Sequence, residues 1–377
     1  MNPATSPAAR VDDARLLMVD EHGNVSHLAQ VDFPSLVRAN DLVVANDAAT
    51  LPASLRGVHA PTGAVIEVRL AGRDSLRPEQ VTRFTAVIFG AGDFRTPTEH
   101  RPLPPAVRLG DALRLGPLRA AVTHVHAHPR LIEVTFEDTV ARIWEALARY
   151  GRPIQYAYVP EPLAIWDTWT RIAGRPVAFE APSAGFLLTW RTIHELRGRG
   201  ARLATITHAA GISSTGDDQL DALLPLDEPY FIPSSTAALI DQTKGRRGRV
   251  IAIGTTVVRA LEHAARDDGS VRSGDGIATE RIGPSTSLHV VDAIVSGVHE
   301  VGSSHYELLR AFQTDDVLGR VDAEADRRGY LTHEFGDFVF IERRRTGRPG
   351  LVSPGTVHTK AADRVSGAAA VRTASGR

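Results

Sequence analysis

The 377-residue sequence contains no cysteine, has almost no net charge and lacks any long apolar run. Without cysteine there is no disulfide, thiolate zinc site, iron–sulfur cluster or cysteine nucleophile to consider. The formal net charge is −1, from 43 Lys and Arg against 44 Asp and Glu, which argues against a uniformly basic nucleic-acid binder. No stretch reaches the length of a membrane span and the first ten residues do not form a secretory signal, so we predict a cytoplasmic protein without membrane contact.

The composition is that of a folded globular protein, with 43% hydrophobic and 23% charged residues. A chain of this length predicts two domains, because single domains usually contain about 100–200 residues. From about residue 343 onward the sequence becomes rich in Arg, Gly, Ser, Thr and Ala without a sustained period. We therefore predict that residues 346–377 form a disordered tail.

Two kinds of strand pattern appear in the first part of the chain. Residues 41–46 form a short apolar run with polar neighbours, as expected for a strand buried on both faces. Residues 64–70 instead alternate between apolar and charged side chains, which is typical of a half-solvated antiparallel sheet. The same alternation recurs at 81–89 and 132–136, with Gly and Pro between the segments. This region is predicted to form a small β-barrel or sandwich.

Beyond Asp138 the period changes to that of a helix, and helices and strands then mix. We expect helices at 189–197 and 235–243 and directly after 253, and strands at 203–207, 250–253, 290–295 and 338–342. The fold class predicted from this order is α/β, with a mixed α/β body and an inserted antiparallel β-barrel domain. The body comprises residues 11–56 and 151–345, and the barrel comprises residues 57–150.

The most informative local segment is a buried strand at 250–253 that runs through Gly254 into a helix beginning with Thr255 and Thr256. The start of such a helix offers unpaired N–H groups, a positive dipole end and two hydroxyls. These groups would bind a phosphate, a carboxylate or a ribose hydroxyl. The alternative is that Thr255 or Thr256 is simply the N-cap of the helix.

Residues 180–185 form a loop of mostly small residues ahead of the predicted helix at 189–197. Small side chains let a ligand approach the backbone closely, and Pro182 stiffens the loop. Ser183 is a weak candidate for an acyl-transfer nucleophile, because the G-x-S-x-G elbow is missing.

Histidines occur in two kinds of position. His124, His126 and His128 alternate, so on a strand their rings would share one face, and three imidazoles on one face are suitable zinc ligands. A solvent-facing strand edge explains the same pattern. His208 and His299 instead follow predicted strands of the α/β body, where side chains point into the ligand-binding crevice. A basic stretch at 244–249 suits either an RNA phosphate or a solvated helix end.

A colinear set of motifs extends from about Asp41 to Glu342. Its members are Asp41 to Asp47 (DLVVAND), Leu51 to Gly57 (LPASLRG), Gly63 to Leu70, Ala181 to Gly185 (APSAG), Val250 to Glu262 (VIAIGTTVVRALE), Val290 to Val295 (VVDAIV) and Gly336-Asp337. This set resembles the S-adenosylmethionine:tRNA ribosyltransferase-isomerase family of queuosine biosynthesis. The resemblance implies a two-domain enzyme with an α/β body and an inserted β-barrel, in agreement with the pattern analysis.

The resemblance also implies an activity and a set of site residues. Members of the family transfer and isomerise the ribosyl part of S-adenosylmethionine onto an aminomethyl-deazaguanine base in tRNA, releasing adenine and methionine without a metal. The sulfonium acidifies the C5′ hydrogens, so that a positioned base can form an ylide. His208 and His299 match family histidines and are the implied acid–base residues. The residues implied to line the nucleoside site are Asn46, Asp47, Pro182, Ser183, Gly185, Gly254, Thr255, Thr256 and Arg259.

The chain departs from the family pattern in several loops. The family loop Pro-Thr-Ala-Gly-Leu-His-Phe reads Pro182 to Leu188 here and lacks the histidine, and the His-Ser-Glu motif reads Asp227-Glu228-Pro229. The segment after residue 297 carries a second histidine, His305. Because loops carry specificity on a retained scaffold, a divergent paralogue is expected. Two alternatives follow: a transferase or lyase using S-adenosylmethionine with a small-molecule acceptor such as a deazapurine nucleoside, or a non-catalytic nucleotide- or RNA-binding paralogue.

Overall fold

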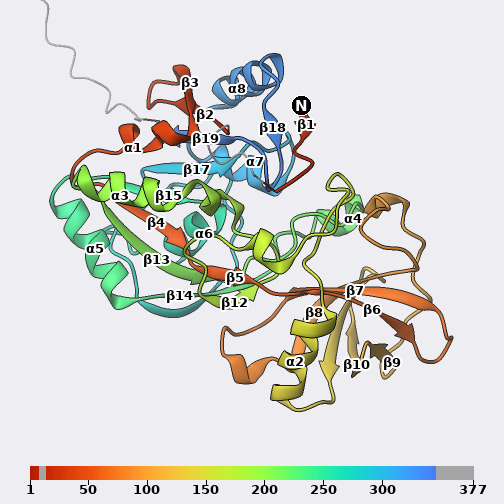
Figure 1. Cartoon of the computed structure of the whole chain (residues 1–377). Coiled ribbons are helices and arrows are strands. Elements are labelled where there is room, and N and C mark those ends of the chain that lie inside the picture. The colour runs from red at the N-terminus through yellow and green to blue at the C-terminus, as the bar shows by residue number, and fades with distance from the viewer. Residues whose placement is uncertain (8–13, 345–377) are drawn as a thin grey trace, which may run out of the picture. The chain divides into compact units, whose positions relative to one another are not determined.

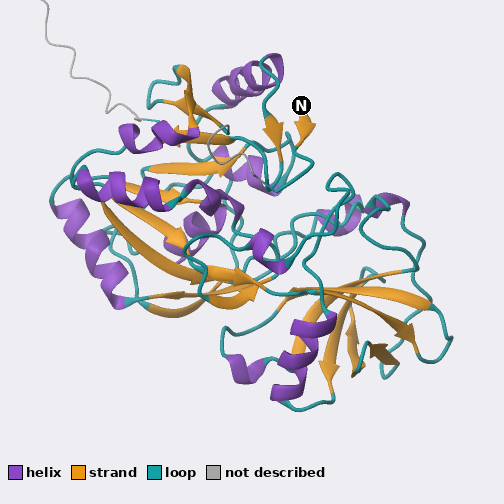
Figure 2. Ribbon diagram, in the orientation of Figure 1, coloured by secondary structure: helices purple, strands orange, loops and turns teal. Residues whose placement is uncertain are grey.

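A nine-stranded mixed sheet dominates the computed structural model, which describes residues 1–7 and 14–344 (Figures 1 and 2). In spatial order its strands are β16 (Gly274–Ala278), β14 (Glu228–Ile232), β13 (Arg202–His208), β4 (Leu42–Asn46), β15 (Val250–Ile253), β17 (Ala293–Gly297), β19 (Phe338–Glu342), β2 (Arg15–Val19) and β3 (Val25–Ala29). The four strands β13, β4, β15 and β17 run parallel to one another. The strands that flank them, β14 and β19, are antiparallel to them, and β19 in turn pairs with β2 in parallel.

Strand β4 is buried on both faces, as its continuous apolar run predicts. Leu42 and Val44 point into a core with residues of α5, α6, α7 and α8. Val43 and Ala45 point into a second core with residues of α1 and α3. The helices are α1 (Phe33–Leu36), α2 (Val140–Tyr150), α3 (Trp190–Gly198), α4 (Asp218–Asp221), α5 (Ser234–Gly245), α6 (Thr255–His263), α7 (Ser304–Leu309) and α8 (Asp315–Arg327).

The position of β4 in the sheet creates a topological switch point. Strands β13 and β15 pair with opposite edges of β4, and all three run in the same direction. In open α/β sheets, ligands bind in the crevice outside the carboxyl ends of such strands. The ends of β4, β13 and β15 are Asn46, His208 and Ile253, so these residues mark where a site is expected.

A closed antiparallel barrel is inserted between β4 and β13 in the sequence. Its strands, in spatial order, are β10 (Leu118–Val125), β11 (Leu131–Phe136), β8 (Arg83–Phe89), β7 (Val65–Gly72), β6 (Ser54–His59) and β9 (Ala112–Leu115). The predicted fold class is confirmed. Residues 1–344 cluster as one compact unit by their contacts, so the division of the body and barrel into two domains stays a prediction. The tail predicted at 346–377 lies outside the described residues.

One predicted strand begins later than expected. The strand predicted at 290–295 is β17, which starts at Ala293 and ends at Gly297. Val290 and Val291 are buried, but their N–H groups donate to the Glu262 carboxylate and not to a neighbouring strand. This carboxylate on α6 therefore accepts the hydrogen bonds that a neighbouring strand would otherwise accept from these two residues.

Short elements complete the fold. They are the pairs β1 (Asn2–Pro3) with β18 (Leu331–Thr332) and β5 (Ala48–Thr50) with β12 (Arg175–Ala178), and the 3-10 turns η1 (Gln30–Asp32), η2 (Pro78–Gln80), η3 (Thr98–His100), η4 (Ile165–Thr168) and η5 (Ser183–Leu187). None of the helices in the described ranges is both long and apolar enough to span a membrane.

Candidate active site

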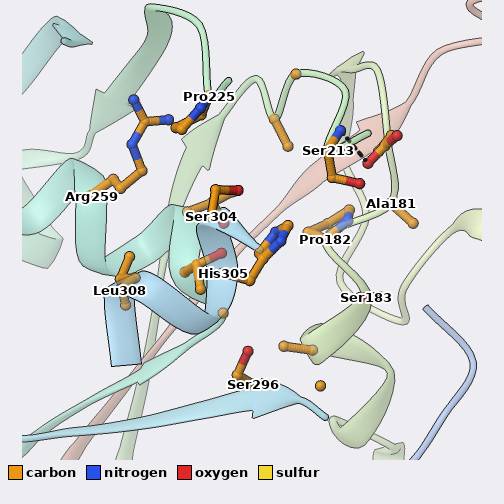
Figure 3. Close-up of a pocket in the computed structure, with 18 of the residues that line it drawn as sticks. Ala181, Pro182, Ser183, Ser213, Pro225, Arg259, Ser296, Ser304, His305 and Leu308 are labelled. Carbon is orange, nitrogen blue, oxygen red and sulfur yellow. Dashed lines mark hydrogen bonds between the residues drawn. The ribbon is translucent and has the colours of Figure 1, made fainter. Parts of the chain in front are cut away.

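A cavity lies at the carboxyl ends of the parallel strands, and we call it the turn chamber. It contains about 720 Å³ of space free of protein atoms, part of which is open solvent. Figure 3 shows the ring of His305 between Arg259 on one side and Pro182 on the other. The lining of the turn chamber includes Glu180, Pro182, Ser183, Gly211, Ser213, Glu228, Gly254, Thr255, Thr256, Arg259, Ser296, His299, Ser304 and His305.

The start of α6 forms one wall of the turn chamber. The N-cap is Gly254, with φ +98° and no side-chain capping bond. Glycine suits this position because other residues rarely adopt such a φ. The alternative in which Thr255 or Thr256 caps the helix is therefore wrong. Since no side chain caps the helix, its first N–H groups and the two threonines, which line the chamber, are available to a ligand.

Arg259 lies one turn further along α6 and is 6% exposed. Its guanidinium forms a salt bridge with the Glu228 carboxylate and donates to the carbonyls of Ala278 (3.0 Å), Leu226 (3.3 Å) and Glu280 (3.4 Å). Burial raises the pKa of Glu228 while the Arg259 charge opposes this shift. The arginine implied to bind substrate is thus held firmly by its own neighbours.

His208 ends β13 but does not line the turn chamber. Its side chain is fully buried, and its Nε2 lies 3.4 Å from the Glu228 carboxylate without the geometry of a hydrogen bond. Burial and the Arg259 charge hold the pKa of His208 well below its usual range. The imidazole is therefore neutral, and the contact with Glu228 is not an ion pair.

His299 and His305 meet at the turn chamber from two elements. His299 follows β17, and His305 is in the first turn of α7. Their rings stack with centroids 4.4 Å apart and planes 10° apart, and the Nε2 of His299 lies 3.1 Å from the hydroxyl of Ser296. Burial, followed by the neighbouring histidines, holds the pKa of His299 well below its usual range, and burial lowers the pKa of His305 to about 4. Both rings are neutral at pH 7.

Three of the residues implied to bind substrate lie outside the lining of the turn chamber. The Asn46 side chain joins two strands, since its amide donates to the His208 carbonyl (2.9 Å) and its oxygen accepts from the His208 N–H (3.0 Å). Asp47 accepts from the hydroxyls of Thr205 and Thr207. Gly185 packs against Thr170. The Asn46 amide also donates to the hydroxyl of Thr256, which lines the chamber (3.4 Å). The predicted binding roles of all three residues stay predictions.

A second cavity adjoins the turn chamber, and we call it the acidic chamber. It shares Glu180, Ala181, Ser183, Ser213, His299, Ser304 and His305 with the turn chamber and adds Ser214, Asp218, Asp221, Ala222, Glu300, Val301, Gly302, Ser303, His333 and Glu334. Most of this group is not predicted from the sequence. The local signals in it are the loop of small residues that begins at Glu180 and the histidines His299 and His305.

Glu180 stands at the junction of the two chambers. It accepts hydrogen bonds from the Tyr156 hydroxyl and the Ser213 N–H. Burial and the nearby charge of Glu334 raise the pKa of Glu180 to about 7. A carboxyl with such a pKa exchanges a proton readily near neutral pH, which is typical of acid–base groups in active sites.

The alternating histidines of the barrel do not form a metal site. His124 lies within β10, whereas His126 and His128 lie in the segment that follows this strand. The ring of His128 faces Asp217 at 3.3 Å. Within residues 1–7 and 14–344, no group of three or more metal-ligating side chains is arranged to hold an ion. Within the basic stretch, Arg249 forms ion pairs with Asp41 and Glu342 and Lys244 donates to the His289 carbonyl, whereas Arg246 and Arg247 are exposed.

A family model described as "Queuosine biosynthesis protein" matches residues 2–341. The chain belongs to this family. It is similar to the S-adenosylmethionine:tRNA ribosyltransferase-isomerases of Geobacter metallireducens (31% identity over 345 residues, 90% of this chain and 95% of the relative) and Anaeromyxobacter dehalogenans (31% over 352 residues, 90% and 96%). A crystal structure of S-adenosylmethionine tRNA ribosyltransferase from Thermotoga maritima matches 90% of this chain and 95% of its own, with 22% identity and a TM-score of 0.48. The family resemblance drawn from the motifs is confirmed.

Proposed function

We propose that this chain is a transferase that acts on S-adenosylmethionine. It moves and isomerises the ribosyl part onto a deazaguanine-type base in tRNA and releases adenine and methionine. The observation that carries this proposal is the turn chamber, where an uncapped helix start meets motif residues of the family at a sheet switch point. The names of the relatives, 31% identical over 90% of the chain, supply both substrates.

The wall formed by α6 suits the nucleoside part of S-adenosylmethionine. The N–H groups of the first turn and the hydroxyls of Thr255 and Thr256 donate hydrogen bonds to ribose hydroxyls or to a carboxylate. Gly254 has no side chain, so the ligand can approach the backbone there closely. A site built this way orients the ribosyl part by fixed donors, and its geometry does not depend on a flexible side chain.

His299 is the histidine placed to exchange a proton with the substrate. The sulfonium of S-adenosylmethionine acidifies the neighbouring C5′ hydrogens, and a neutral imidazole accepts such a proton. His299 lines both chambers and is held by Ser296 and by its stack on His305. His208 sits behind Glu228 instead, so we assign it a positioning role through that carboxylate.

The decisive experiment incubates the full chain with S-adenosylmethionine labelled in adenine and in methionine. Three reactions are compared: tRNA carrying aminomethyl-deazaguanine, the same tRNA carrying guanine, and no tRNA. Release of both labels only with the deazaguanine tRNA supports the proposal. Release without tRNA favours a small-molecule acceptor or a lyase, and tight binding without release indicates a non-catalytic paralogue. Absence of S-adenosylmethionine binding contradicts all three functions.

The variant His299→Ala tests the assignment of the acid–base group. Turnover should fall about 10²–10⁴-fold, the usual contribution of a positioned proton acceptor. The dissociation constant of S-adenosylmethionine, measured by calorimetry, should change little. His194→Ala is the matched control, because His194 is exposed on α3, away from both chambers. If His299→Ala weakens the binding of S-adenosylmethionine but saturated enzyme still turns over at the normal rate, His299 is a binding residue and not the base.

A further inference from the structure

The acidic chamber is lined by carboxylates, and no lysine or arginine is present among its described lining residues. The carboxylates are those of Glu180, Asp218, Asp221, Glu300 and Glu334. In the turn chamber, by contrast, the Glu228 carboxylate is paired with Arg259. A cavity that gathers carboxylates without matching cations favours a positively charged ligand.

Two of these carboxylates are the best placed to meet a ligand. Asp221 is already engaged, because it accepts from the hydroxyls of Ser214 and Thr215 and from the Thr215 N–H. The side chain of Glu300 is 64% exposed, so water screens its charge. Glu180 and Glu334 are only partly exposed, and the charge of Glu334 helps to raise the pKa of Glu180.

Among the residues that the structure describes, no lysine or arginine forms an ion pair with either carboxylate. Glu180 and Glu334 accept from the hydroxyls of Tyr156 and Tyr158 respectively, which are neutral donors. The guanidinium of Arg69 lies 5.7 Å from the centre of the Tyr156 ring, but it does not line the chamber and is bonded to Glu67 at 2.8 Å. The negative charge of the pair is therefore left for a ligand to balance.

A ladder of flat rings borders the same carboxylates. Tyr156 stacks on Tyr158 with centroids 5.8 Å apart, and Tyr158 stacks on His333 at 4.4 Å. His333 is the last ring of the ladder and lines the acidic chamber directly before Glu334. Its φ is +69°, in the left-handed region that histidine adopts more often than most residues other than glycine.

We propose that the acidic chamber binds the acceptor as a planar heterocycle carrying a primary ammonium, with the ammonium on the carboxylates of Glu180 and Glu334 and the ring against His333. This inference rests on the proposed function and adds a specificity-determining pair to it. The aminomethyl-deazaguanine base has this combination of a flat ring and an adjacent cationic arm. The methionyl ammonium of S-adenosylmethionine is a second source of positive charge, but the long ribosyl and methionyl chain separates it from the flat adenine.

Glu334→Gln is the sharpest variant for testing this pair. Glu180 lines both chambers, whereas Glu334 lines the acidic chamber and not the turn chamber, so the change spares the α6 wall. Glutamine has nearly the same shape and its oxygen still accepts from the Tyr158 hydroxyl, while the charge is lost. Glu145→Gln is the matched control, because Glu145 is an exposed carboxylate on α2 in the barrel region.

The experiment measures binding of three probes to the full chain by calorimetry. The probes are aminomethyl-deazaguanine as the free base, methyl-deazaguanine, which lacks the amine, and S-adenosylmethionine. The wild type should prefer the amine-bearing base by about tenfold or more, as expected for a charge-assisted hydrogen bond. Glu334→Gln should remove this preference and leave the affinities for methyl-deazaguanine and S-adenosylmethionine within about twofold. Glu145→Gln should retain it, and Glu334→Asp provides a second, charge-retaining variant if the amide variant folds poorly.

Each contrary result has a distinct meaning. If Glu334→Gln weakens S-adenosylmethionine and not the amine-bearing base, the acidic chamber holds the methionyl ammonium and the inference is overturned. The inference is also overturned if Glu334→Gln lowers the affinities for the two deazaguanine bases equally, or if it leaves the preference for the amine-bearing base unchanged. The tRNA turnover assay is run in parallel on the wild type. If the wild type turns over tRNA but Glu334→Gln still prefers the amine-bearing base, this inference alone is rejected. If the wild type shows neither turnover nor binding of S-adenosylmethionine, the proposed function is rejected.

Discussion

In the turn chamber, the guanidinium of Arg259 meets the Glu228 carboxylate and three backbone carbonyls. In the acidic chamber, Glu180 and Glu334 accept from tyrosine hydroxyls, and Glu180 also accepts from the Ser213 N–H. The first arrangement satisfies its own charges and therefore fixes the shape of the site. The second leaves negative charge unpaired, which costs stability and is useful chiefly to a ligand. Neighbouring parts of one site thus divide the tasks of holding shape and recognising charge.

Removing the Arg259 guanidinium should have the largest effect on folding. Arg259→Met leaves the buried Glu228 carboxylate without its cation and should lower the free energy of unfolding by about 3–5 kcal/mol. The double variant Arg259→Met/Glu228→Gln should recover part of this loss, because the amide is neutral and its oxygen still accepts from the Gly211 N–H. Urea unfolding followed by circular dichroism measures both values. A single variant as stable as the wild type would show that the pair has no structural role.

Changing the α6 wall should have an intermediate effect, on binding only. Thr255→Ala removes a hydroxyl from the lining of the turn chamber, and the affinity for S-adenosylmethionine should fall about three- to tenfold, the loss expected for one hydrogen bond. Thr255→Ser keeps the hydroxyl and serves as the control. Calorimetry with S-adenosylmethionine distinguishes the two variants. Equal weakening in both would indicate that the methyl group of Thr255, and not its hydroxyl, matters.

The contrast between the chambers also explains what the sequence could predict. The α6 wall lies within one continuous motif, so the apolar run at 250–253, the glycine and the two threonines point to it together. The ladder of the acidic chamber has no such local signal. Tyr158 and Glu334 are 176 residues apart in sequence, and only the folded chain brings them together. Likewise, the family resemblance implies Asn46 and the strand end predicts His208 as site residues, but neither lines the turn chamber, and the Asn46 side chain bonds to the His208 backbone and to the Thr256 hydroxyl.

The smallest expected effect is a pH dependence of stability with opposite signs for two variants. Because the pKa of Glu180 is raised to about 7, the folded state retains a proton that the unfolded state, with an ordinary carboxyl, releases near pH 4.5. This group therefore lowers stability as the pH rises from about 4.5 to 7. His305 acts in the opposite direction, since burial lowers its pKa to about 4 and the unfolded state binds the proton first as the pH falls below 6.5.

Relative to the wild type, Glu180→Gln should thus become more stable as the pH rises through this window. His305→Asn should become less stable relative to the wild type over the same rise, because it lacks the histidine whose titration stabilises the wild type. Urea midpoints measured at half-unit steps between pH 4.5 and 7.5 give both differences, and the shared wild-type reference cancels the titration of all other groups. If both differences change with pH in the same direction, the pKa of Glu180 in the folded state is not raised as expected. Opposite directions would establish that unpaired charge and neutral imidazoles coexist at the junction of the two chambers, as a site that moves protons near neutral pH requires.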